Sequence, residues 1–139
     1  MRVLLLSAAA LIAAPLAAHA EEPVMGVWAA PVDDARVEIV ACGPKLCGKV
    51  LSSGQIKSRP DIRDAYNHDQ SLRDRPLKGL VIMNGFTGGP TEWKGGTVYD
   101  PKTGSTYSGS IKLIAADQLK LTGCIVYPLC QSQTWKRVH

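Results

Sequence analysis

The chain has 139 residues and a formal net charge of +4, with 16 Lys and Arg against 12 Asp and Glu. Its length fits one domain, and its basic side chains are scattered rather than gathered into one block. This distribution argues against a nucleic-acid-binding protein, whose basic residues normally concentrate on one face.

Residues 1–20 have the features of a cleaved secretory leader. Arg2 supplies a basic start, an apolar run follows over residues 3–16, and Ala18-His19-Ala20 places small residues around a cleavage point. The apolar run is too short for a resident transmembrane helix, and no later segment is long enough. We therefore expect a periplasmic or secreted protein without a membrane span, in which residues 21–139 form a single domain.

The rest of the chain is typical of short strands separated by turn signals. We expect eight strands, at residues 24–29, 35–42, 47–52, 79–84, 92–100, 105–114, 118–127 and 131–138. Alternation is clearest in the later ones, where Leu119 and Leu121 oppose Lys120 and Thr122. Because closure removes exposed strand edges, this pattern predicts an all-β fold, a small up-and-down antiparallel β-barrel. A two-sheet sandwich is the alternative.

Residues 55–78 interrupt the strand pattern. They are rich in charge and include two prolines, so they predict a long polar excursion between the third and fourth strands, with one turn of helix over residues 62–67. Loops of this length are usually functional or disordered. Its second half, residues 67–77, has a sequence too specific for a disordered segment.

The cysteine count is even, which in a small exported chain indicates disulfides. The pairs Cys42–Cys47 and Cys124–Cys130 each bracket a turn-like segment, and facing hairpin positions lie near the distance that a disulfide needs. Loop entropy alone favours a crossed pairing, so the local pairing depends on geometry. A zinc site is disfavoured because short Cys-x-x-Cys pairs are absent.

Two resemblances add to this interpretation. Gly26-Val27-Trp28 at the start of the first strand and Arg137 in the last resemble the lipocalin signature, in which the arginine covers the tryptophan at the closed end of a barrel. Strings across the mature chain resemble the exported bacterial family known as domain of unknown function 2147. They include Cys42-Gly43-x-x-Leu46-Cys47, Asn67-x-Asp69-x-x-Leu72-Arg73-x-Arg75-Pro76, Tyr99-Asp100-Pro101 and Trp135-x-Arg137. The resemblance implies a small lipocalin-like barrel and no established reaction.

No arrangement typical of catalysis is visible. Asp64, His68 and Asp69 are better explained as solvated loop residues than as a metal site, and no nucleophile motif is present. We therefore expect a protein that is not an enzyme, with no catalytic residue, metal or cofactor. The candidates for ligand or partner binding are Asn67, Asp69, Arg73, Arg75 and Trp93.

These candidates have structural explanations too. Arg73 and Arg75 could fork onto a ligand's carboxylate or phosphate, but we favour contacts with carboxylates or carbonyls inside the excursion. Trp93 could line a cavity, although alternating aromatics are more often core.

Two hypotheses for function follow. The first is a carrier or sensor that binds a small, largely apolar molecule in the periplasm. The second is a non-enzymatic cell-envelope module, with a closed barrel, whose loops contact another protein. We expect a monomer in either case.

Overall fold

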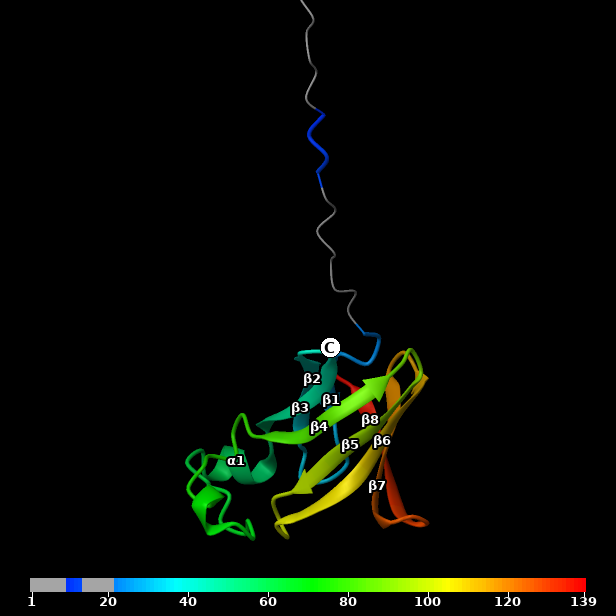
Figure 1. Ribbon diagram of the computed structural model, residues 1–139. Coiled ribbons are helices and arrows are strands. Elements are labelled where there is room, and N and C mark those ends of the chain that lie inside the picture. Colours follow the sequence, from blue (N-terminus) through cyan, green and yellow to red (C-terminus); the bar gives the residue numbers. More distant parts are fainter. Residues whose placement is uncertain (1–9, 14–21) are drawn as a thin grey trace, which may run out of the picture.

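The computed structural model describes residues 10–13 and 22–139 (Figure 1). The predicted leader, residues 1–20, lies outside the described residues except for 10–13. The strands are β1 (Gly26–Ala29), β2 (Arg36–Cys42), β3 (Lys45–Ser52), β4 (Val81–Gly88), β5 (Glu92–Asp100), β6 (Ser105–Ala115), β7 (Gln118–Val126) and β8 (Leu129–Arg137). A short helix α1 (Gly54–Ser58) and a 3-10 turn η1 (Gln70–Leu72) lie between β3 and β4. Neither described helix is long and apolar enough to cross a membrane.

The strands form a closed antiparallel barrel in which each pairs with its neighbours in sequence. The predicted all-β barrel is confirmed, and predicted and observed strands agree to within a few residues. Pairing between β1 and β8 closes the barrel through only two register pairs, Trp28 with Arg137 and Ala29 with Lys136. The up-and-down order gives the barrel two ends. The terminal end carries both chain ends and the β2–β3, β4–β5 and β6–β7 turns, and the loop end carries the other four connections.

Large side chains fill the barrel axis. Apolar residues at alternating strand positions point inward, and the buried cluster comprises Val24, Trp28, Val37, Ile39, Leu46, Met83, Phe86, Trp93, Ile111, Leu119, Leu121 and Trp135. The ring of Phe86 occupies the space above Gly96, where a Cβ would lie 2.5 Å from the ring. Burying each large apolar side chain stabilises the fold by roughly 1.5–3 kcal/mol.

The excursion has more structure than the sequence predicted, and one prediction is wrong. Residues 62–67 are not helical, because the Leu77 N–H donates to the Ile62 carbonyl and the Asp64 N–H donates to the Arg75 carbonyl, which holds the segment in an extended pairing. The helical turn occurs earlier, as α1, where the Ser53 side chain accepts from the Ile56 N–H and caps the first turn.

A second apolar cluster lies under the excursion. Val50, Ile56, Leu77 and Leu80 are buried together, and Ile62, Ile82 and Tyr99 pack against them. These contacts dock the excursion on β3, β4 and β5 at the loop end of the barrel (Figure 1).

Candidate functional site

Arg137 seals the terminal end. Its guanidinium lies 4.3 Å from the ring centroid of Trp28, which is fully buried and donates from Nε1 to the Val24 carbonyl. Arg137 also donates to the carbonyls of Met25 at 2.8 Å and Pro23 at 2.6 Å. One side chain therefore combines a cation–π contact with hydrogen bonds to the segment preceding β1.

Trp93, one of the predicted binding candidates, belongs to the barrel core. Its side chain is 1% exposed, which leaves no surface for a ligand to contact. Its Nε1 is the one buried side-chain polar atom without a hydrogen-bond partner among the described residues. Sequence alternation favoured the core position, and the burial agrees with it.

Asp64 is the centre of a polar cluster between the excursion and β5. Its carboxylate is completely buried and accepts hydrogen bonds from the Tyr99 hydroxyl, from Asn67 Nδ2 at 2.9 Å and from Arg75 Nε at 2.9 Å. The Arg75 guanidinium also lies 5.6 Å from the Tyr99 ring centroid. A buried charge is tolerated only when it is paired and hydrogen-bonded, and this one is both.

The cluster shifts two pKa values in opposite directions. Burial by itself raises the pKa of Asp64, but the hydrogen bonds from Tyr99, Asn67 and Arg75 outweigh it, so the pKa of Asp64 lies below its ordinary value. Burial and the hydrogen bond to Asp64 raise the pKa of Tyr99 to about 12. Asp64 is therefore ionised and Tyr99 neutral near pH 7.

The remaining excursion candidates lie beside this cluster. The buried Asn67 accepts from the Asp69 N–H at its Oδ1, and its carbonyl accepts from Arg73 Nε at 2.7 Å. Asp69 caps η1 by accepting from the N–H and hydroxyl of Ser71, and these bonds lower its pKa. Four of the five predicted binding residues are thus brought together. Each makes contacts inside the excursion, as the structural interpretation of Arg73 and Arg75 expected.

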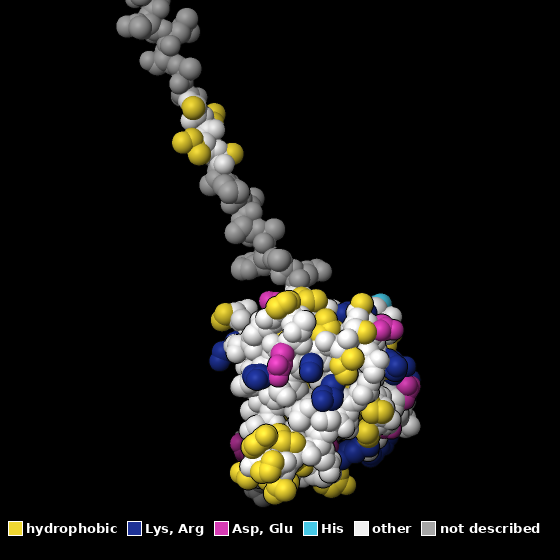
Figure 2. Space-filling model, turned by 90° about the vertical axis from the view of Figure 1, so that its right-hand side faces the viewer, with side chains coloured by type: hydrophobic (Ala, Val, Ile, Leu, Met, Phe, Trp, Pro, Cys, Tyr) yellow, Lys and Arg dark blue, Asp and Glu magenta, His cyan; other side chains and the backbone are white. Residues whose placement is uncertain are grey.

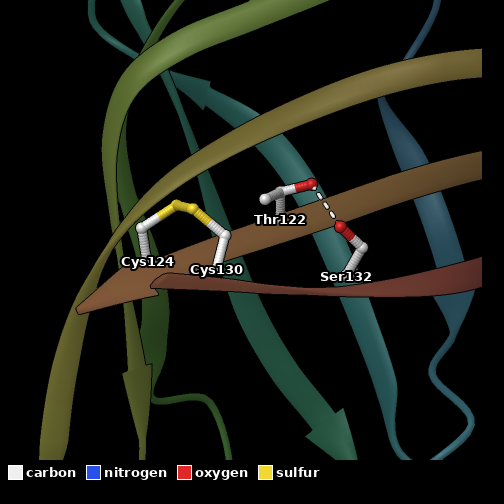
Figure 3. The surroundings of a disulfide bond; sticks show 4 residues. All are labelled: Thr122, Cys124, Cys130 and Ser132. Atoms are coloured by element: carbon white, nitrogen blue, oxygen red, sulfur yellow. Dashed lines mark hydrogen bonds between the residues drawn. A yellow bond between two sulfur atoms is a disulfide. The ribbon is translucent and has the colours of Figure 1, made fainter. Parts of the chain in front are cut away.

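The β7–β8 hairpin tip is the clearest exposed apolar feature. Ile125, Val126, Tyr127 and Leu129 are 75%, 64%, 87% and 66% exposed. At the base of the tip, Cys124 and Cys130 lie directly opposite each other and form a disulfide (Figure 3). The neighbouring hydroxyls of Thr122 and Ser132 are 2.8 Å apart. Hydrophobic side chains gather at this lower end of the molecule (Figure 2). The cross-link fixes the base of an apolar tip that faces solvent.

In the described part of the chain, the edge of β8 that faces β1 has no backbone pairing between Lys136 and the hairpin tip. The Arg137 N–H donates to Asp117 at the β7 side, and the Val138 N–H donates to Val27 in β1. Because backbone groups alternate along a strand, the N–H and carbonyl groups of Ser132 and Thr134 point to the β1 side. Pairing with β1 stops at Lys136, and the backbone bonds of residues 30–35 do not reach β8.

Sequence reasoning missed both the tip and this edge. It interpreted residues 125–129 as a turn-like segment between two cysteines, with residues 125–127 at the end of a strand, although four large apolar residues in so short a segment are an unusual signal. The second cysteine pair, Cys42 and Cys47, also forms a disulfide, at the terminal end of the barrel. Within the described ranges, no group of three metal-binding side chains lies close enough to hold an ion.

The chain belongs to a family of uncharacterized proteins conserved in bacteria, domain of unknown function 2147, whose profile matches residues 26–137. No curated protein matches the chain. Among solved structures, it is similar to a protein from the human pathogen Helicobacter pylori that is described as belonging to the lipocalin family. The two structures superpose with a TM-score of 0.76 and 21% sequence identity, over 86% of this chain and 85% of the other. This similarity shows that the two proteins share the barrel fold.

Proposed function

We propose that this family member is a non-enzymatic interaction module of the bacterial cell envelope, exported to the periplasm, which binds another protein through the β7–β8 hairpin. The observation that carries the proposal is the unpaired β8 edge beside a disulfide-fixed apolar tip. Export rests on the predicted leader, and the two disulfides suit an oxidising compartment.

The filled barrel favours this function over a small-molecule carrier. Lipocalin-type carriers hold their ligand inside the barrel. Here Trp28, Phe86 and Trp93 are each at most 1% exposed along the axis. An apolar ligand of useful size would have to displace several packed core side chains, each stabilising the fold by roughly 1.5–3 kcal/mol.

The edge and the tip provide complementary parts of a protein interface. An extended segment can add to an exposed strand edge through main-chain hydrogen bonds. An exposed aromatic side chain such as Tyr127 is typical of the residues that dominate binding energy, and Leu129 beside it adds apolar surface. Residues 124–130 carry no charge, so the tip lacks the Lys and Arg that usually accompany attachment to anionic membranes.

Proline substitution at β8 tests the proposal. Ser132→Pro removes an N–H that faces the open edge, whereas Gln133→Pro removes one that faces β7. We expect the first to leave the melting temperature within a few degrees of wild type and the second to lower it markedly.

Partner retention by tagged protein in its own periplasm is then compared among wild type, Ser132→Pro and the double variant Tyr127→Ser/Leu129→Ser. Loss of the same protein in both variants, with unchanged melts, supports the proposal. Equal retention in all three refutes it. A co-purifying small apolar molecule in native mass spectra would instead support the carrier function.

A further inference from the structure

A groove on the outer surface of the excursion has the composition of a ligand site. It lies between α1, the segment that follows it and the β5–β6 turn, and encloses about 640 Å³, within the range of small-molecule sites. Ile62, Ala65, Leu77 and Pro101 give it apolar surface. Around them stand the polar side chains Gln55, Arg59, Asp61, Arg63, Tyr66 and Lys102.

Positive charge dominates the groove. Three cations, Arg59, Arg63 and Lys102, line it together with one carboxylate, Asp61. None of the three cations takes part in a salt bridge among the described residues. Arg63 uses one nitrogen on the Asp74 carbonyl, and its planar guanidinium has further donors to offer.

The walls of the groove are held in fixed relation to each other. Gly104, in the β5–β6 turn, packs so closely on the Tyr66 carbonyl that a Cβ there would lie 1.9 Å from its oxygen. The Tyr99 hydroxyl donates to Asp64 next to the groove, and Arg63 forms a strand-like bridge with Pro76. Binding would therefore require little ordering of backbone, which keeps its entropic cost low.

We propose that this groove binds a small amphiphilic anion, a phosphate monoester or carboxylate attached to an apolar or aromatic body. The acid group would be held by the arginine and lysine donors, since arginine matches the planar geometry of such groups. The apolar body would lie on Ile62 and Ala65 and stack against the Tyr66 ring, which is 68% exposed. This site lies apart from β8, so the inference is independent of the proposed partner interface.

The test uses phenyl phosphate as the probe, with inorganic phosphate and phenol as its two halves. Titration into the full mature protein, followed by amide chemical shifts, should give saturable changes at Ile62, Tyr66 and Lys102. We expect phenyl phosphate to bind at least tenfold more tightly than either half, because both the charged rim and the apolar surface contribute.

A matched pair of charge variants distinguishes binding in the groove from general electrostatic attraction of the anion to a basic protein. Arg59→Gln/Lys102→Gln removes two groove cations, and Lys112→Gln/Lys120→Gln removes two that face each other on β6 and β7. We expect the first variant to weaken phenyl phosphate at least tenfold and the second to change it less than twofold. Absence of saturable shifts, or equal weakening by both variants, would overturn the proposal. If the groove variant melts early, Tyr66→Ser is measured in its place, with the same tenfold criterion.

Vesicles containing phosphatidic acid identify the natural source of the anion. Sedimentation of wild type with these vesicles, but not of Arg59→Gln/Lys102→Gln, assigns the groove to a lipid headgroup. Binding of phenyl phosphate without sedimentation assigns it to a free phosphate ester.

Discussion

Replacing Asp64 tests whether the polar cluster holds the excursion on the barrel. Asp64→Ala removes a buried carboxylate that accepts three hydrogen bonds and pairs with Arg75. The Tyr99 hydroxyl and the Asn67 amide would then lose their acceptor in a site that water enters poorly. The variant therefore damages both the ion pair and its hydrogen-bond network.

The expected cost follows from burial. Removing one partner of a buried ion pair typically costs about 3–5 kcal/mol. The Arg75 side chain is 35% exposed, so water can solvate part of its charge after the change, and we expect the lower end, about 3 kcal/mol. A small domain has roughly 5–15 kcal/mol of stability, so the barrel should remain folded.

Urea unfolding and trypsin cleavage measure the two consequences. Asp64→Ala should shift the unfolding midpoint down and open the excursion to cleavage at Arg63 or Arg73. The matched control is Asp74→Ala, which removes an exposed carboxylate from the same segment and should stay within about 0.5 kcal/mol of wild type. Equal stability and equal protease resistance of the two variants would refute the bracing role.

Three further predictions concern the turns, the closure and pH. Gly95 and Gly104 share a φ of +74°, but a Cβ would meet a neighbouring atom, the Tyr66 carbonyl oxygen, only at Gly104. Gly104→Ala should therefore lower the melting temperature by several degrees more than Gly95→Ala. Arg137→Ala should remove its cation–π contact with Trp28 and lower the free energy of unfolding by at least about 1–2 kcal/mol. It should also increase quenching of Trp28 fluorescence, and unchanged quenching would contradict the covering of Trp28 by Arg137. The pKa of Tyr99 is raised from 10.0 to about 12 in the folded protein, so its neutral form stabilises the fold by about 2–3 kcal/mol. This part of the free energy of unfolding should be present below pH 10 and lost between pH 10 and 12. The loss should be absent in Tyr99→Phe.

The barrel could be predicted because its signals are local and repeated. Alternation in strands such as β7 marks the inward face, and two local cysteine pairs mark hairpins. The terminal pairing of Trp28 with Arg137 followed from a short signature rather than from any periodic pattern. Each of these features can be recognised within a few residues.

The excursion could not be predicted in detail because its structure depends on distant contacts. Asp64 is charged, which in a sequence predicts exposure to solvent, yet Tyr99, 35 residues later, supplies a hydrogen-bond donor to its buried carboxylate. The α1 helix begins where Asp33, 22 residues earlier, accepts from the Gln55 N–H. Likewise, the open β8 edge exists because β1 ends at Ala29, before Pro31, which has no N–H to continue the pairing.

The two disulfides should differ in function although they are similar in size. They join residues five and six apart, so loop entropy gives each a contribution of about 2 kcal/mol. Only Cys124–Cys130 lies at the base of the exposed tip, where it cross-links the two arms of the hairpin that carries Tyr127 and Leu129. Non-reducing peptide mapping should recover both local pairs. Replacing either pair by serine should then lower stability, and the Cys42/Cys47 change should lower it more because Cys47 is buried. Only the Cys124/Cys130 change should reduce partner retention. Equal loss of retention in both variants would show that the tip's cross-link has no special part in binding.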